Sequence, residues 1–318
     1  MRAGRRHILH LARALAATAL LAGCDPARLV QDDRPPPRPA PPRPAPPPAR
    51  SAESEALARY YARVQDSFLA QGLLRTDGGG PDVPFDARDL VENFIRIALF
   101  EEYATVDGRI IARQTPSRLH KWVAPVRMQV IFGRTVPRDQ QRRDRDSIAA
   151  YVARLSRITG LPMRLVPENA NFHVFIVNEE ERRALGDRIR RLLPGIDEAT
   201  VKAVTDMPRS TFCLVFALNS EETGTYSRAL AVIRGEHPDL MRLSCIHEEI
   251  AQGLGLSNDS PKARPSIFND DEEFALLTSH DEMLLRILYD PRTIPGMTAR
   301  EARPIVETIA AELLGGSS

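Results

Sequence analysis

Apolar residues recur at helical spacing in five segments of the chain, and this predicts five amphipathic helices. In the first segment the pattern is carried by Tyr60, Tyr61, Val64 and Phe68. The predicted helices cover residues 51–74, 89–103, 144–159, 240–256 and 298–314. Gly160 follows the third segment directly, as is typical of the residue that ends a helix.

A second pattern, in which apolar and polar residues alternate, predicts strands. It is clearest in residues 121–133, where Val126, Met128 and Val130 share one side. Three further strands are predicted at residues 171–178, 211–219 and 226–234. A strand, a long helix, several strands and then helices predict an α+β domain.

The first 23 residues have the features of a secretory signal peptide. Four arginines precede an apolar stretch at residues 14–23, which is too short to span a bilayer. The stretch ends in Leu21-Ala22-Gly23-Cys24, which resembles the lipobox of bacterial lipoproteins and implies that Cys24 is lipidated. The alternative is an ordinary signal peptide with a chance cysteine.

Residues 35–48 contain ten prolines interrupted only by arginine and alanine. Such a segment favours extended polyproline II, roughly 40 Å long at about 3.1 Å per residue. Its position after a lipidated cysteine favours a stalk, and the alternative is a docking motif for a proline-binding module or for the cell wall.

The charge balance argues against a nucleic-acid binder. The whole chain has 43 basic and 42 acidic residues, but nine basic and three acidic ones lie in residues 1–50, so the remainder is mildly acidic. A nucleic-acid binder needs a basic face. No apolar run after residue 23 is long enough to cross a membrane.

Two cysteines, Cys213 and Cys245, remain once Cys24 is set aside. In an oxidising compartment they are candidates for a disulfide. The alternative is that both are buried free thiols.

One helical segment contains the candidate chemistry. His247-Glu248 begins like an HExxH zinc motif, but Ala251 stands where the second histidine is needed. Moved by one residue, the segment from Glu248 to Asn258 resembles the metzincin motif HExxHxxGxxH, with Gly255 at the glycine position. This resemblance implies a helix over residues 248–256, with Gly255 as the residue that terminates it. The helix is expected to pack beneath an antiparallel-edged sheet.

Two later segments keep the order of the metzincin elements. Residues 266–269 resemble the Met-turn, with Phe268 in the methionine position, which implies that this turn lies directly beneath the motif helix. Residues 277–290 resemble the closing metzincin helix and include Asp281 and Tyr289. The resemblance implies a metzincin-like α+β fold, with a mixed, mostly antiparallel-edged sheet, a long helix, a motif helix and C-terminal helices.

The whole chain, including its lipobox, its stalk and the acidic phrase at residues 265–292, more closely resembles the domain of unknown function 2927 family of bacterial envelope proteins. No activity has been assigned to that family. The alternative is an unrelated α+β domain whose helix ends by chance in Leu-Gly-Leu.

The metzincin resemblance also identifies what has changed. Glu248, Gln252 and Asn258 replace the three zinc-binding histidines, while the general-base glutamate is kept as Glu249. Neutral amides are poor zinc ligands, so an active zinc hydrolase is not expected unless Asp259 or His247 takes a ligand position.

Two other roles remain open for these residues. The oxygen-rich set of Glu248, Gln252, Asn258 and Asp259 suits calcium. Alternatively, the same side chains replace the metal by hydrogen bonds, with Asp281 holding the Phe268 turn in place. The acidic residues 269–273 are interpreted as helix-capping rather than as a calcium loop.

These observations predict four regions: a signal peptide at 1–23, a lipidated cysteine and stalk at 24–50, a helix and Gly-rich linker at 51–80, and a metzincin-like domain at 85–318. The predicted function is a non-catalytic binding or scaffold domain, anchored in the bacterial envelope by lipid on Cys24 and facing the periplasm. A divergent metal-dependent peptide hydrolase and a calcium-stabilised module are the alternatives. No cofactor is expected, although zinc or calcium fits the alternatives, and an envelope protein or peptidoglycan is the candidate partner.

Overall fold

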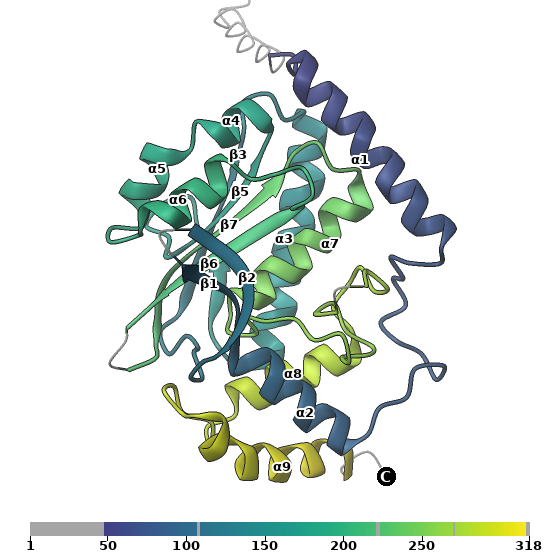
Figure 1. Ribbon diagram of the computed structural model, residues 1–318, viewed down its shortest axis with the longest axis vertical. Helices are drawn as coiled ribbons and strands as arrows, with labels where there is room; N and C mark the ends of the chain where they lie inside the picture. The colour runs from purple at the N-terminus through teal and green to yellow at the C-terminus, as the bar shows by residue number, and fades with distance from the viewer. Residues whose placement is uncertain (1–47, 107–108, 221–222, 270, 316–318) are drawn as a thin grey trace, which may run out of the picture. The chain divides into compact units, whose positions relative to one another are not determined.

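The computed structural model describes residues 48–106, 109–220, 223–269 and 271–315 (Figure 1). The predicted signal peptide, Cys24 and nearly all of the proline-rich segment lie outside the described residues. Within the described ranges, no helix combines the length and the apolar character that crossing a membrane requires.

A five-stranded mixed sheet forms the centre of the fold, with strand order β4-β3-β5-β7-β6. The strands are β3 (Val126–Phe132), β4 (Met163–Leu165), β5 (Phe172–Val177), β6 (Cys213–Asn219) and β7 (Tyr226–Arg234). The pairings of β3 with β4, β3 with β5 and β5 with β7 are parallel, whereas β6 pairs antiparallel with β7 and forms one edge. The predicted α+β class is confirmed, and the sheet is mixed with a single antiparallel pairing.

Helices cover both faces of this sheet (Figure 1). On one face, alternate strand residues such as Val174 and Ala231 belong to the main core, together with residues of the helices α3 (Arg138–Thr159) and α7 (Asp239–Gln252). On the other face, Phe175 and the residues in register with it pack against the short helices. These are α5 (Gly186–Leu192) and α6 (Glu198–Thr205), and α4 (Glu179–Arg183) precedes them in the chain. The central strand β5 is therefore buried along its whole length.

The remaining helices complete the main core. They are α1 (Ala52–Ala70), α2 (Ala87–Ala98), α8 (Ser279–Tyr289) and α9 (Ala299–Gly315). The predicted helix at 298–314 matches α9, and Thr298 and Glu301 bond each other's backbone N–H at its start, as in a capping box.

The first turn of α1 is bonded to the rest of the fold. The buried Ser54 hydroxyl donates to Glu236 at 2.6 Å, and Arg183 forms an ion pair with Glu53 at 2.6 Å. Just before the helix, the Arg50 guanidinium donates to the carbonyl of Gly235 at 3.0 Å. The start of α1 is thus held by both polar and charged contacts.

The predicted helix at 89–103 is too long. Helix α2 ends at Ala98, and the following residues form a hairpin of β1 (Phe100–Val106) and β2 (Arg109–Pro116). The two strands pair antiparallel from Phe100↔Pro116 to Val106↔Arg109. Pairing with a later segment therefore overrides the helical pattern at 100–103.

The predicted strand at 121–133 begins later, at Val126. The Lys121 ammonium instead reaches a cage of carbonyls, donating to Leu288 at 2.9 Å and to Thr293 at 2.5 Å. The other three strand predictions lie within two residues of the observed bounds. Gly160 ends α3 with a left-handed φ of 69°, as expected.

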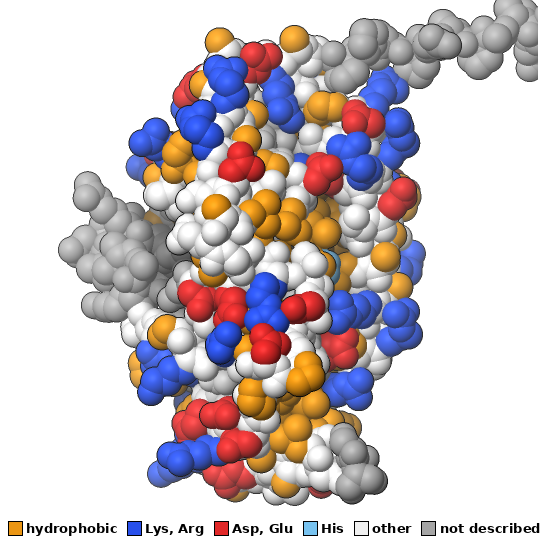
Figure 2. Space-filling view, turned by 90° about the vertical axis from the view of Figure 1, so that its right-hand side faces the viewer, with side chains coloured by type: hydrophobic (Ala, Val, Ile, Leu, Met, Phe, Trp, Pro, Cys, Tyr) orange, Lys and Arg blue, Asp and Glu red, His pale blue; other side chains and the backbone are white. Residues whose placement is uncertain are grey.

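Surface charges of the two signs are interspersed rather than gathered on the face shown in Figure 2. Ion pairs are also shared among several partners, since Arg75 pairs with Asp77, Asp82 and Glu273. That face offers no continuous basic surface of the kind a nucleic-acid binder presents.

Candidate functional site

One face of helix α7 collects the polar residues singled out from the sequence. Three of them, Glu248, Glu249 and Gln252, follow Cys245 by three, four and seven positions. All four residues therefore share one side of the helix. Their side chains meet the edge strand β6 and the loop after the helix, where all four line one cavity. The local sequence therefore places a row of oxygen and sulfur atoms against β6.

The predicted end of this helix is corrected. Helix α7 ends at Gln252 with a right-handed cap at Gly253, and Gly255 lies beyond it. Gly255 has a φ of 126°, and a Cβ added there would come within 2.2 Å of the His120 carbonyl oxygen. Gly255 is therefore required by a close backbone approach and not as the residue that caps the helix.

The cavity has a volume of about 510 Å³ and runs along β6. Every residue of β6 from Cys213 to Asn219 lines it. The described lining residues include no Lys, Arg or His and six acids: Glu101, Asp197, Glu248, Glu249, Asp259 and Glu272. The described part of the lining is therefore acidic, and the outer strand of the sheet borders the cavity.

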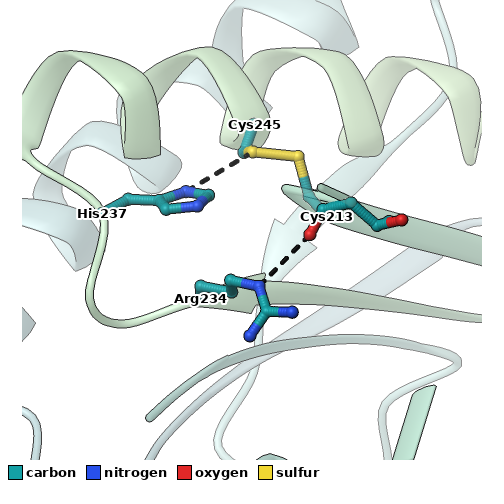
Figure 3. Close-up of a disulfide and its surroundings, with 5 residues drawn as sticks. Cys213, Arg234, His237 and Cys245 are labelled. Atoms are coloured by element: carbon teal, nitrogen blue, oxygen red, sulfur yellow. Dashed lines mark hydrogen bonds between the residues drawn. A yellow bond between two sulfur atoms is a disulfide. The ribbon is translucent and has the colours of Figure 1, made fainter. Parts of the chain in front are cut away.

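A disulfide between Cys213 and Cys245 joins the start of β6 to α7 (Figure 3). The two Cα atoms are 6.0 Å apart. The Cys213 sulfur and carboxylate oxygens of Glu248 and Glu249 all lie within 4.8 Å of one another. The disulfide thus forms one end of the cavity, directly beside two of the candidate site residues.

Two further candidates lie in the same cavity. The Gln252 amide donates to the Asp259 carboxylate at 3.2 Å. Both side chains are largely buried, and both line the cavity with Glu248 and Glu249. The structure therefore brings together Glu248, Glu249, Gln252 and Asp259.

Asn258 does not belong to this group. It is fully buried, its backbone N–H donates to the carbonyl of Ile97, and its side-chain amide donates to the carbonyl of Arg96 at 2.8 Å. Asn258 therefore anchors the end of α2, and its neighbour Asp259 occupies the cavity instead. A zinc site built on the positions 248, 252 and 258 does not fit this arrangement.

His247 points away from the cavity as well. Its ring stacks on Tyr151 with centroids 3.9 Å apart, and its Nδ1 accepts a hydrogen bond from the Leu277 N–H at 3.1 Å. Burial lowers the pKa of His247 to about 3, with a further contribution from the charge of Arg154. A neutral imidazole whose Nδ1 serves a backbone donor is part of the core.

The Phe268 turn is held by Asp281. The fully buried Asp281 carboxylate accepts from the Ser266 hydroxyl at 2.5 Å and from the Ile267 N–H at 3.1 Å, besides capping α8 through Thr278. Phe268 is fully buried in the core cluster that also contains Ile250, Ala251 and Leu254 of the motif segment.

Tyr289 fixes the chain that follows α7. Its hydroxyl donates to the Leu254 carbonyl at 2.9 Å, and the Trp122 indole N–H donates to the Gly253 carbonyl at 2.9 Å. These two bonds satisfy carbonyls just past the end of the helix. Tyr289 therefore positions the segment that leads to Asp259.

The sequence pattern did not identify His237, which lies next to the disulfide (Figure 3). Its Nδ1 is 3.8 Å from the Cys245 sulfur, and its side chain is 3% exposed. Burial lowers the pKa of His237 well below its usual value, and the charges of Arg234 and Arg242 lower it further. His237 stands in a turn eight residues before Cys245, and no spacing rule connects the two.

Buried charge pairs close to His237 were also missed. Arg234 pairs with Glu179 at 2.6 Å, and Arg242 pairs with Asp144 at 2.8 Å, with all four side chains almost fully buried. Each pair joins elements distant in sequence, so only the folded structure identifies them.

Comparison with known proteins gives one match. The family model described as protein of unknown function (DUF2927) matches residues 87–308, more than half of the chain. No curated protein and no solved structure matches.

Proposed function

The chain belongs to the DUF2927 family of proteins of unknown function, and from that premise we propose that it is a lipid-anchored protein of the bacterial envelope whose folded domain binds an extended basic peptide without cleaving it. The observation that carries the proposal is the acidic cavity along the edge strand β6.

The edge strand supports the peptide-binding part of the proposal. In the described sheet, β6 pairs with β7 on one side only, so alternate N–H and C=O groups along its other edge point away from the sheet. An extended peptide binds such an edge by adding a strand, with its side chains entering pockets alongside. The cavity supplies the space for those side chains.

The charge of the cavity supports a basic ligand. Six acids and no basic residue occur among its described lining residues. Opposite charge accelerates encounter and selects the partner, and like charge excludes wrong partners. Lysine and arginine side chains therefore fit this cavity better than acidic ones.

The donor set argues for binding rather than hydrolysis. The four residues gathered in the cavity offer carboxylates and one amide, whereas zinc hydrolases use imidazole with at most one carboxylate. The two residues that could have completed a ligand set, Asn258 and His247, are bonded to backbone groups elsewhere.

A metzincin-like ancestry is part of this proposal. It is supported by the strand, long helix and strand series from β3 to β5, by the antiparallel edge at β6, and by the Asp281-held turn packed against the motif segment. In that view Glu249 is the retained general-base position. The cavity corresponds to a cleft that has lost its catalytic ligands.

Anchoring is tested on Cys24. The motif Leu21-Ala22-Gly23-Cys24 motivates the experiment, and Cys24→Ala should move the protein from the membrane pellet to the soluble periplasmic fraction, because acyl chains provide the attachment. A mutant that stays in the pellet would refute the lipid anchor.

Peptide binding is tested with two short peptides of equal length, one alternating lysine with apolar residues and one carrying glutamate in place of lysine. The lysine peptide should bind the full-length protein, weaken with salt, and slow hydrogen exchange of the amides at 213–219. Glu248→Gln with Glu272→Gln should weaken binding by about tenfold at low salt. Glu282→Gln, which lies on α8 outside the cavity and pairs with Arg154, is the matched control. Equal binding of both peptides, or no protection of β6, would contradict the proposal.

Metal analysis separates the two alternatives. Stoichiometric zinc in protein purified without chelator would favour a divergent hydrolase. Stoichiometric calcium would favour a structural module built on the oxygen atoms of Glu248, Glu249, Gln252 and Asp259.

A further inference from the structure

We propose that the peptide bound along β6 runs antiparallel to that strand and carries a basic residue at every second position, with apolar residues between. The basic residues are the ones whose backbone bonds β6. This inference rests on the proposed peptide binding and adds to it the direction of the peptide and the side of β6 on which each of its residues lies. The antiparallel direction is assigned because antiparallel pairing is slightly more stable per residue than parallel pairing.

The backbone bonds of β7 determine which groups of β6 point outward. The Ala229 N–H donates to the Asn171 carbonyl at 2.9 Å, and the Gly235 N–H donates to the Val177 carbonyl at 2.8 Å, both on the side of β5. Backbone groups alternate between the two edges of a strand, so every second residue from 229 to 235 is bonded toward β5. The residues between them, such as Leu230, are therefore bonded toward β6.

The same alternation continues into β6. Leu214 and Phe216 lie opposite Val232 and Leu230, so their backbone groups bond β7. The intervening residues direct their N–H and C=O groups to the outer edge, and they are Cys213, Val215 and Ala217. In the described sheets β6 has β7 as its only strand neighbour, and the β1–β2 hairpin forms a sheet of its own. An antiparallel peptide would exchange backbone hydrogen bonds with these three residues.

The side chains of these three residues lie on the side of helix α7. Cys213, Val215 and Ala217 pack against the main core, which contains residues of α7. Carboxylate oxygens of Glu248 and Glu249 lie within 4.8 Å of the Cys213 sulfur. Residues directly opposite each other in an antiparallel pair place their side chains on the same face of the sheet. The peptide residues that bond β6 therefore direct their side chains to the acidic side, where lysine or arginine fits.

The other side of β6 is apolar. Phe216 and Leu218 pack against the second core cluster together with Ile196, and all three line the cavity. Asp197, the acid that the start of α6 contributes to the described lining, accepts from the Thr200 N–H at 2.8 Å and from the Thr200 hydroxyl at 2.7 Å. Its carboxylate therefore serves as the cap of α6. Peptide residues on this side have their backbone groups turned away from β6, and apolar side chains fit them best.

The test uses the full-length protein and a short peptide of alternating lysine and leucine with blocked ends. Two derivatives carry equal numbers of N-methyl groups, one on the lysine amides and the other on the leucine amides. Methylation of the lysine amides should lower affinity by about a hundredfold, because several backbone hydrogen bonds to β6 are lost together. Methylation of the leucine amides should change affinity by about threefold or less, because these amides point away from β6.

Isothermal titration of the three peptides separates the possible arrangements. In parallel addition the residues that bond β6 would direct their side chains to the α6 side, so leucine methylation would be the harmful change. That result, or equal effects of the two methylations, would overturn the proposal. A lysine–leucine peptide that does not bind before methylation would refute the proposed peptide binding itself, so the two failures are distinguishable.

A variant tests the apolar side separately. Ile196→Asp should weaken binding of the lysine–leucine peptide by about fivefold, because part of a leucine side chain loses its apolar contact. The same variant should strengthen binding of a peptide with lysine at every position. Ile294→Asp is the matched control, since Ile294 is 57% exposed and lies outside the described lining. Unchanged affinities in Ile196→Asp would overturn the placement of apolar residues on this side.

Discussion

Two faces of helix α7 carry polar residues that are neighbours in sequence but have different surroundings. One face packs in the core, and the other lines the cavity. On the face toward α3 and α8, His247 stacks on Tyr151 and accepts from the Leu277 backbone. On the face toward β6, Glu248 and Glu249 line the cavity beside the disulfide. The first face bonds backbone groups and packs in the core, and the second lines the cavity along β6.

The comparison teaches that residue type alone does not identify a ligand. Histidine is the usual metal ligand, yet His247 is structural, while His237, which belongs to no motif, lies beside the sulfur atoms. A polar residue that satisfies a buried backbone donor is bound to the fold, because removing it leaves that donor unmet. Substitutions on the core face should therefore cost stability, and substitutions on the cavity face should change binding.

The largest effect on the free energy of unfolding is expected from Asp281→Ala, because Asp281 holds the Phe268 turn. The carboxylate accepts from Ser266, Ile267 and Thr278 with no exposure to water. Its loss should lower the free energy of unfolding by about 4 kcal/mol, because several buried donors lose a charged acceptor together. Urea unfolding measures this, with Glu282→Gln as control, and a loss under 1 kcal/mol would show that Asp281 does not hold the turn.

The next effect separates Asn258 from Asp259. Asn258→His should cost about 3 kcal/mol, since a larger ring replaces a fully buried amide bonded to Arg96. Asp259→His should cost less, because this side chain borders the cavity.

Zinc affinity sharpens the same comparison. We expect the triple variant Glu248→His, Gln252→His and Asp259→His to bind zinc through three imidazoles. The triple variant that carries Asn258→His in place of Asp259→His should not bind zinc. Isothermal titration of both folded variants measures this. Equal zinc affinity in the two would contradict the separation of Asn258 from the cavity.

A pH effect of about 2 kcal/mol is expected from His247. Its pKa is about 3 in the folded protein, held low by burial, and near 6.5 when unfolded. The unfolded state therefore binds more protons between these values, and stability falls as pH drops below about 6.5, by about 1.4 kcal/mol per unit. His247→Gln should show a shallower loss of unfolding free energy between pH 7 and pH 5. An unchanged slope would place the titrating group elsewhere.

The smallest effect is expected on the cavity face. Glu249→Gln should change the free energy of unfolding by about 1 kcal/mol or less, the usual size for a modest polar substitution. If the protein were a hydrolase, the same change would abolish peptide cleavage with the fold intact. A peptidase assay beside the unfolding curve distinguishes the two, and cleavage by the wild type that this variant loses would overturn the non-catalytic proposal.

Much of the fold could be predicted where the pattern is local. The strands β5, β6 and β7 are rich in apolar residues, and Gly160 ends α3 where the periodicity stops. The hairpin after α2 and the short helices α4 to α6 could not be predicted. Their form depends on pairing and packing with distant segments, which no local pattern encodes.

The part of the site that lies on helix α7 could also be predicted from local spacing, and the part beyond the helix could not. The four-residue spacing of Glu248 and Gln252 places both on one side of a helix, as the structure has them. Beyond the end of the helix, sequence spacing does not predict which side chains enter the cavity. The Asn258 N–H is bonded to the Ile97 carbonyl, and Asp259 lines the cavity instead. The approach of His237 to Cys245 depends on tertiary packing and not on sequence distance.

The bonds at the start of α1 have a mechanical consequence. The chain enters the folded part at Arg50 and Ser54, where the guanidinium donates to Gly235 and the hydroxyl to Glu236. A pull on the preceding segment loads these bonds and the Arg183–Glu53 pair first. We therefore expect such a pull to reach helix α7 only after the bonds at the first turn of α1 have broken.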